Sequence, residues 1–260
     1  TVIGELTEEI MEETGMKKVP VIAVGSHDTA SAVCGTPLAG ENSIFLSSGT
    51  WALIGMELPE PVITEDSLAY NFTNEGGVEG TIRFLKNITG LWILQQLKKK
   101  WNETNPSVGY PEIIAAARAA EHRHFTIDPD EDVFTAPMDM VKAVQDYCEA
   151  HGQGRPETMG EIAMAAYNGL AQKIKVHAES LEKLTGREAT DIHMVGGGIQ
   201  DQFLCETLAR ESGKKLVTGP IEAAVAGSVL MQMKALGALG SLQEGRDLIA
   251  RSFPLKSYEP

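Results

Sequence analysis

Short apolar runs, separated by turns of small and polar residues, fill the first third of the chain. Runs of this length predict β-strands, here over residues 19–24, 43–46, 51–56, 68–72 and 81–85. The first run, VPVIAV, is continuously apolar and predicts a buried strand. The second and third runs flank Ser47-Ser48-Gly49-Thr50 and predict a β-hairpin, and the last two predict another antiparallel pair with a loop between them.

Beyond Thr89 the apolar residues recur every three to four positions, which is the period of an amphipathic helix. The predicted helices cover residues 89–98, 111–121, 138–151 and 156–184. The last third then alternates strand and helix, at 192–195, 199–212, 216–217 and 221–236, and ends in an extended segment, SFPLKSYEP. Alternating strands and helices predict parallel pairing. Together with the antiparallel strands of the first third, the pattern predicts an α/β domain with a mixed sheet flanked by helices.

The 260 residues include 36 acidic and 22 basic side chains, which gives a net charge of -14. This charge repels phosphate backbones and anionic lipid surfaces, so we expect no nucleic-acid and no membrane partner, and only a local pocket to hold an anion. No apolar run approaches the about 20 residues that cross a bilayer. Three widely spaced cysteines without a CxxC pair predict no disulfide framework and favour a cytoplasmic location.

The tetrapeptide Ser26-His27-Asp28-Thr29 follows the first predicted strand and precedes a helix of small residues. This order places Asp28 at the carboxyl edge of the sheet, where the sites of α/β proteins gather. A carboxylate there, beside the donors of His27 and Thr29, can accept a proton from a substrate hydroxyl. The other interpretation is that Asp28 or Thr29 only caps the helix.

Two glycine-containing turns are candidate phosphate sites. The turn Ser48-Gly49-Thr50 combines backbone amides with a hydroxyl, although a plain hairpin turn looks the same. The triple glycine Gly196-Gly197-Gly198 follows a strand and opens a helix, so a ligand can approach its backbone closely and an anion is favoured at the helix start. It matches neither GxGxxG nor a P-loop, which disfavours a dehydrogenase.

Asn87 and Gln95 lie eight positions apart, so both can face one side of a helix that begins near Asn87. Capping of that helix is the alternative role for Asn87. The three tryptophans, Trp51, Trp92 and Trp101, are interpreted as packing residues.

Several of these motifs, in this order, resemble the FGGY family of carbohydrate kinases and, within it, the rhamnulokinases. The matching segments are SHDTASAV, LSSGTWALIG, TNEGG, LKNITGLWILQQ, IHMVGGGIQ and GPIEAAVAGSVLMQMKALG. The resemblance covers nearly the whole chain and implies an actin-like, ribonuclease-H-like ATPase domain. By this resemblance, residues 1–240 are the C-terminal ATP-binding and catalytic domain, and residues 241–260 are a truncated C-terminal extension.

The resemblance also implies transfer of the γ-phosphoryl group of ATP to the 1-hydroxyl of L-rhamnulose, which gives L-rhamnulose 1-phosphate, with magnesium as cofactor. Asp28 is then the general base, and His27, Thr29 and Asn87 contact the sugar. The residues implied to contact ATP are Gly49, Thr50, Gln95, Gly196, Gly197 and Gly198. The magnesium ligands stay unassigned.

Two departures from the family qualify this expectation. The family usually has Asn where this chain has Asp201, which places an extra carboxylate near the nucleotide. A complete member also carries an N-terminal domain with a further phosphate loop and part of the sugar pocket, so we expect this chain alone to be inactive. The alternatives are a kinase for another ketose, such as L-fuculose or L-xylulose, and a non-catalytic actin-like nucleotide-binding module.

Overall fold

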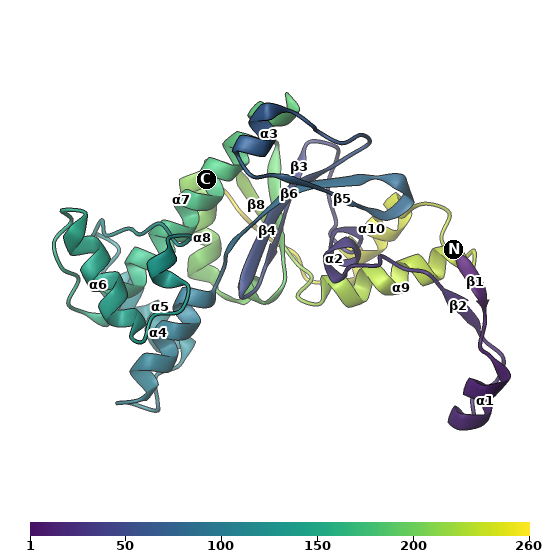
Figure 1. Ribbon diagram of the computed structural model, residues 1–260, viewed down its shortest axis with the longest axis horizontal. Helices are drawn as coiled ribbons and strands as arrows, with labels where there is room; N and C mark the ends of the chain where they lie inside the picture. Colours follow the sequence, from purple (N-terminus) through teal and green to yellow (C-terminus); the bar gives the residue numbers. More distant parts are fainter.

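A mixed sheet of seven strands forms the centre of the computed structural model, which describes residues 1–260 (Figure 1). Its strand order is β5-β6-β4-β3-β7-β8-β9. Strands β3, β7 and β8 pair in parallel, and the other neighbours pair antiparallel. The strands are β3 (Ser43–Ser48), β4 (Trp51–Leu58), β5 (Thr73–Gly76), β6 (Ile82–Thr89), β7 (Asp191–Val195), β8 (Lys215–Thr218) and β9 (Lys256–Tyr258). The predicted mixed sheet is confirmed.

Helices cover both faces of this sheet (Figure 1). The long helix α7 (Met159–Thr185) and α8 (Gln202–Ser212) lie on one face, with α4 (Trp92–Asn102), α5 (Tyr110–Ala119) and α6 (Met140–Ala150) beside them. On the other face lie α2 (Asp28–Cys34), α9 (Ala223–Ala235) and α10 (Leu242–Ser252). None of these helices is both long and apolar enough to span a bilayer.

Strand β3 shows why the central strands are continuously apolar. Ile44 and Leu46 belong to the large core on the α7 side, whereas Phe45 packs with Val33 of α2 on the opposite side. Successive side chains of a strand point to opposite faces, so a strand covered on both faces must be apolar throughout. This is the pattern from which the strand was predicted.

The prediction of a buried strand over residues 19–24 is wrong. Strand β2 (Pro20–Ile22) pairs only with β1 (Val2–Glu5), in a separate two-stranded sheet, and is at most half-buried. This sheet and α1 (Glu8–Thr14) project beyond the α9 end of the molecule (Figure 1). The continuous apolar run indicates a strand, but it cannot indicate which sheet the strand joins.

Two further boundaries differ from the prediction. Residues 68–72 are not a strand, because a capping box at Thr64 starts the short helix α3 (Glu65–Ala69), and β5 supplies the partner of β6 instead. Strand β6 runs on to Thr89, because it pairs along the full length of β4. Helix α10 was not expected, whereas the extended C-terminal segment is confirmed as β9, which pairs with β8.

Helices α2 and α9 meet backbone to backbone. A Cβ atom added to Gly227 of α9 would lie 1.8 Å from the carbonyl oxygen of Ser31, and one added to Gly35 would lie 2.2 Å from the carbonyl oxygen of Ala223. Both distances are far below a van der Waals contact. Only glycine therefore permits this approach, which holds α2 against the rest of the domain.

We expect Gly227→Ala to destabilise the protein by about 1–3 kcal/mol, because the new methyl group forces the helices apart. Gly245→Ala in α10 is the matched control, since it gains the same helix propensity and meets only the ends of the Leu230 and Leu239 side chains, at 3.3 and 3.5 Å, and no backbone atom. Urea denaturation of both variants measures the difference. Equal stabilities would contradict the backbone contact.

Candidate active site

The N-terminus of α2 presents Asp28 to solvent from a buried helix. The residues of α2 from Thr29 to Cys34 are all buried, while the Asp28 side chain is 85% exposed. His27 is the N-cap residue, and its ring accepts a hydrogen bond from the Thr29 amide. Capping alone therefore does not account for Asp28, whose carboxylate is left accessible on a rigid support.

Three consecutive residues form a small hydrogen-bonded group at this position. The Thr29 amide and hydroxyl both donate to Oδ1 of Asp28, at 2.7 and 3.3 Å. The Thr29 hydroxyl also lies 2.6 Å from Nδ1 of His27. Oδ1 of Asp28 is thus oriented by its neighbours, and the carboxylate retains acceptor capacity for a ligand.

A pocket of about 650 Å³ opens beside this group. All four residues predicted for catalysis and sugar contact line it: His27, Asp28, Thr29 and Asn87. The other lining residues come from β3, β4, β5, α2 and α9: Ala32, Ser47, Trp51, Leu53, Glu75 and Ala224. The pocket is therefore built from the carboxyl end of the parallel strand β3 and from elements packed around it.

Asn87 reaches the pocket from a strand, which corrects the prediction that it begins a helix. It lies in β6 opposite Leu53 of β4, and Leu53 in turn lies opposite Ser47 of β3. These three neighbours across the sheet share one face. Gln95 lies on α4 instead, so Asn87 and Gln95 do not share a helix face.

Two residues of the pocket escaped the sequence analysis. Trp51 was expected to be a packing residue, but it is 64% exposed, whereas Trp92 and Trp101 do pack against the core. Glu75 lies in a segment read as a loop, and its carboxylate is held at 3.0 Å by the buried guanidinium of Arg83. The signal for Trp51 was its position directly after the Ser48-Gly49-Thr50 turn.

The β3–β4 turn is held by the chain segment that precedes α4. The amide of Leu91 donates to the carbonyl of Gly49, and the amides of Gly90 and Trp92 donate to that of Thr50. The Gly49 amide is used within the turn, where it donates to the Trp51 carbonyl, so the expected row of exposed amides is incomplete. The predicted hairpin itself is confirmed.

Thr50 and Gln95, both predicted to contact the nucleotide, lie together. The Thr50 hydroxyl donates to Oε1 of Gln95 at 3.2 Å. Thr50 also lines a second hollow of about 280 Å³, to which Trp51 contributes as well. Trp51 therefore stands between this hollow and the larger pocket of Asp28.

The three glycines of the turn after β7 have different surroundings. Gly196 has a φ of +92°, and a Cβ atom there would lie 2.5 Å from the Ser48 carbonyl oxygen. At Gly198 a Cβ atom would lie 2.2 Å from the Ser48 hydroxyl, while Gly197 has open space around it. Gly196 and Gly198 thus pack this turn against the end of β3, and Gly197 is the position that a ligand can approach.

The triple glycine does not line the pocket of Asp28, but it lies at the same edge of the sheet. Ser48 touches the glycine turn, and its neighbour Ser47 lines the pocket. On the face beneath α2, Ala32 packs with Val195, the residue that precedes Gly196. The structure therefore gathers the predicted sugar and nucleotide residues at adjoining positions.

No cluster of three or more His, Cys, Asp or Glu side chains in the chain is arranged to hold a metal ion. The side chains at the site do not by themselves form a magnesium site. No step is therefore assigned to a protein-bound metal.

Comparison with known proteins shows the family to which the chain belongs. The model of the C-terminal domain of the FGGY family of carbohydrate kinases matches residues 44–236. The chain belongs to the FGGY family of carbohydrate kinases. It is 43% identical over 258 residues to a rhamnulokinase of Bacteroides thetaiotaomicron and 36% identical over 258 residues to one of Bacillus subtilis. Both alignments cover 99% of this chain.

Solved FGGY kinase structures show the same actin-like fold. A ligand-bound xylulose kinase from Lactobacillus acidophilus matches all of this chain with a TM-score of 0.73 at 15% identity. Plasmodium falciparum glycerol kinase with ADP matches 98% of it with a TM-score of 0.71 at 13% identity. The predicted fold class is confirmed. The chain spans about half the length of the matched proteins, namely 52% and 53% of the two rhamnulokinases and 51% and 50% of the two structures.

Asp201 is the carboxylate expected to depart from the family pattern, and its side chain bonds to groups inside this domain. It caps α8 by accepting a hydrogen bond from the Leu204 amide, and its other oxygen accepts a 2.5 Å hydrogen bond from the Tyr167 hydroxyl. Burial raises the pKa of the Asp201 carboxyl, and these hydrogen bonds offset only part of that effect. Both carboxylate oxygens of Asp201 are thus hydrogen-bonded within the protein.

We expect Asp201→Asn to gain stability relative to the wild type as the pH rises from about 3.5 to 7. A raised folded-state pKa means that the native protein loses stability when Asp201 ionises, and Asn keeps the helix cap without ionising. Urea denaturation at several pH values measures the difference between the two proteins.

Asp139, the N-cap residue of α6, provides a control of opposite sign. Burial opposes ionisation there, but hydrogen bonds from the Lys142 amide and the Lys100 ammonium hold the pKa of Asp139 below its ordinary value. Asp139→Asn should therefore lose stability relative to the wild type over the same rise in pH. Parallel curves for the two variants would contradict the assignment.

Proposed function

We propose that the protein to which this chain belongs is an ATP-dependent sugar kinase that phosphorylates the 1-hydroxyl of L-rhamnulose, giving L-rhamnulose 1-phosphate. Membership of the FGGY family and the identities of 36–43% with rhamnulokinases over nearly the whole chain support this substrate. The observation that carries the proposal is the exposed carboxylate of Asp28, held by a buried helix at the wall of a 650 Å³ pocket.

Asp28 is the general base of the proposed reaction. Its carboxylate takes the proton of the sugar hydroxyl while that oxygen forms a bond to the γ-phosphorus of ATP, and the bond to the bridging oxygen of ADP breaks. Such a transfer requires little covalent chemistry from the protein, so orientation is the main contribution. The Thr29 amide and hydroxyl supply it by fixing Oδ1.

His27, Thr29 and Asn87 are the proposed sugar contacts. They line the pocket around Asp28 and offer imidazole, hydroxyl and amide groups, which hydrogen-bond the hydroxyls of a sugar. Trp51, Leu53 and Ala32 add apolar surface to the lining of the same pocket. A pocket lined by both polar and apolar groups fits a ketose better than a fully charged ligand.

ATP is the proposed second substrate, bound at the edge of the sheet where the two turns meet. Thr50 and Gln95 are hydrogen-bonded to each other, and Gly196 and Gly198 leave Gly197 accessible. Gly49 shapes the turn that presents Thr50. Magnesium is the proposed cofactor, and when bound with the nucleotide it would offset the negative charge of the phosphates.

We propose that the other half of the kinase completes the catalytic cleft. The matched relatives are about twice as long as this chain, and the Asp28 pocket is open to solvent. Phosphoryl transfer requires that water be excluded, which FGGY-type clefts achieve by closure of one domain on another. An FGGY N-terminal domain is therefore a proposed partner of this one.

The 260-residue chain alone should show no phosphorylation of L-rhamnulose above background, because it supplies only one side of this cleft. A coupled assay for ADP release, with ATP, magnesium and L-rhamnulose, measures this. Full turnover by the chain alone would show that the cleft needs no second half. Addition of the N-terminal half as a separate polypeptide is the matching positive experiment.

In the full-length protein, Asp28→Asn should lower kcat by about 10²–10⁴, since that is the usual contribution of a positioned base. This corresponds to about 3–5 kcal/mol of transition-state stabilisation. The affinity for ATP should change little, because Asp28 lines a pocket that neither Gly197 nor Thr50 lines.

Asp66→Asn on helix α3 is the control, since it removes an exposed carboxylate outside the pocket. Its kcat should equal that of the wild type. Undiminished turnover in Asp28→Asn would rule Asp28 out as the base. A panel of L-rhamnulose, L-fuculose and L-xylulose then separates a rhamnulose kinase from a kinase for another ketose, and ATP binding without any turnover would indicate a nucleotide-binding module.

A further inference from the structure

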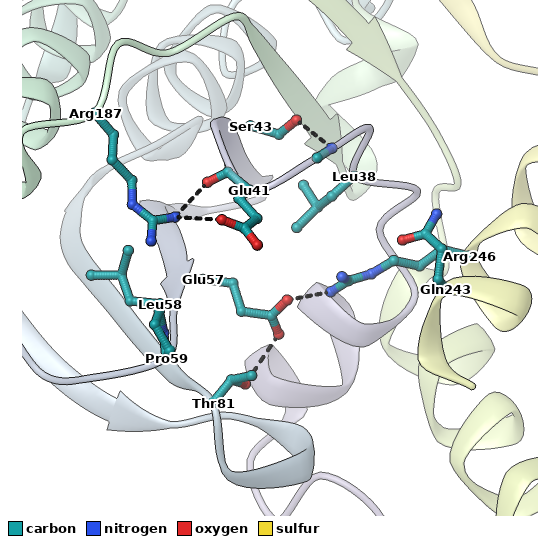
Figure 2. Close-up of a pocket in the computed structure, with 11 residues that line it drawn as sticks. Leu38, Glu41, Ser43, Glu57, Leu58, Pro59, Thr81, Arg187, Gln243 and Arg246 are labelled. Carbon is teal, nitrogen blue, oxygen red and sulfur yellow. Dashed lines mark hydrogen bonds and ion pairs between the residues drawn. The ribbon is translucent and has the colours of Figure 1, made fainter. Parts of the chain in front are cut away.

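A further cavity of about 280 Å³, separate from the hollow beside Thr50, lies at the end of the sheet opposite the Asp28 pocket. Figure 2 shows the residues that line it. It begins at Ser43, the first residue of β3, and at Leu58, the last residue of β4, whereas the Asp28 pocket lies where β3 ends and β4 begins. The two cavities have no lining residue in common. Nothing in the proposed kinase reaction uses this further cavity.

Arg246 of α10 forms one wall of the cavity and is 8% exposed. Its Nη2 donates to Glu57 at 2.8 Å and to the Val33 carbonyl at 3.3 Å, while its Nε has no partner. A buried donor without an acceptor costs about 1–3 kcal/mol, and more when it is charged. Nη1 makes no hydrogen bond either and, unlike Nε, is not sealed from solvent, so it is the donor of this guanidinium that an acceptor in the cavity can reach.

Arg187 stands on the opposite wall, in the segment that follows α7 (Figure 2). One of its nitrogens, Nη1, donates to the backbone carbonyl of Glu41 at 3.0 Å. The Glu41 carboxylate is 3.9 Å away, beyond hydrogen-bond distance, and its side chain is 90% exposed. A pair of this kind contributes little, so most of the Arg187 guanidinium is available to a ligand.

The carboxylate inside the cavity does not neutralise Arg187. Glu57 lies between the two arginines, but it already accepts hydrogen bonds from Arg246 and from the Thr81 hydroxyl. The lining thus holds two carboxylates and two guanidiniums, of which Glu57 and Arg246 are paired closely, whereas Arg187 and the exposed Glu41 are paired only loosely. Gln243, in the first turn of the eleven-residue helix α10, also lines the cavity and adds a side-chain amide to it.

We propose that this cavity binds a small anion through a carboxylate or phosphate group held between Arg187 and Arg246. Both groups match the donor geometry of a guanidinium. At about 30 Å³ for each water molecule, the volume corresponds to about nine waters, which is room for a three- or four-carbon metabolite. Leu38 on one side, and Leu58 and Pro59 on another, add apolar surface for its carbon chain.

The test is a binding titration of the intact chain with inorganic phosphate, glycerol 3-phosphate and lactate. Binding is measured by calorimetry and by the shift in Tm. At least one probe should bind saturably, with a weaker affinity at high salt, and raise Tm. The phosphate and lactate arms distinguish a phosphate ligand from a carboxylate ligand. The proposal would be overturned if none of the three probes bound saturably at concentrations up to about 10 mM.

Three variants locate the binding. Arg187→Met should weaken it by at least about tenfold, since a charge-assisted contact is lost. Glu41→Gln should strengthen it, because the competing carboxylate is removed, and this gain cannot arise from unfolding. Arg251→Met, an exposed arginine of the same helix that does not line the cavity, should leave the affinity unchanged. Equal affinities for Arg187→Met and Arg251→Met would place the anion elsewhere on the surface and overturn the proposal.

Discussion

The contact of α2 with α9 is the constraint on which the proposed active site depends. Helix α2 has only seven residues, too few to be stable as an isolated helix, so its position comes from packing. Gly227 and Gly35 allow the two backbones to touch, and Ala32 packs against Val195 and Ala223. One end of α2 is thereby anchored over the sheet, and Asp28 at the other end has a defined place at the pocket wall.

A second close contact aligns the two turns of the site. Because β3 and β7 pair in parallel, with Ser47 opposite Val195, both strands end at the same edge. Gly196 and Gly198 then let the β7 turn rest on Ser48. Parallel pairing places the two turns at the same edge of the sheet. Because Gly196 and Gly198 have no side chains, the turns can also touch. Neither turn alone is specific to a phosphate site, and the contact between the two turns gives the site its shape.

The sequence predicted best those features that depend on local chemistry. The Gly49-Thr50 hairpin and the βαβα order of the last third both follow from turn residues and apolar period. The sequence-based predictions failed where the structure of a segment depends on a pairing partner far away in the chain. Asn87 is a strand residue because β4 pairs with it, and the 19–24 run stays outside the main sheet because only β1 pairs with it. The capping box at Thr64 was a local signal for α3 that was overlooked.

A row of alternating charges on the α2 side of the sheet joins the two cavities. Glu75 in the Asp28 pocket pairs with Arg83, Arg83 lies directly opposite Glu57 on the neighbouring strand, and Glu57 pairs with Arg246. Buried pairs of this kind add little net stability, but removal of one partner leaves a costly unpaired charge. The wall of the Asp28 pocket and helix α10 are therefore linked by one continuous row of paired charges.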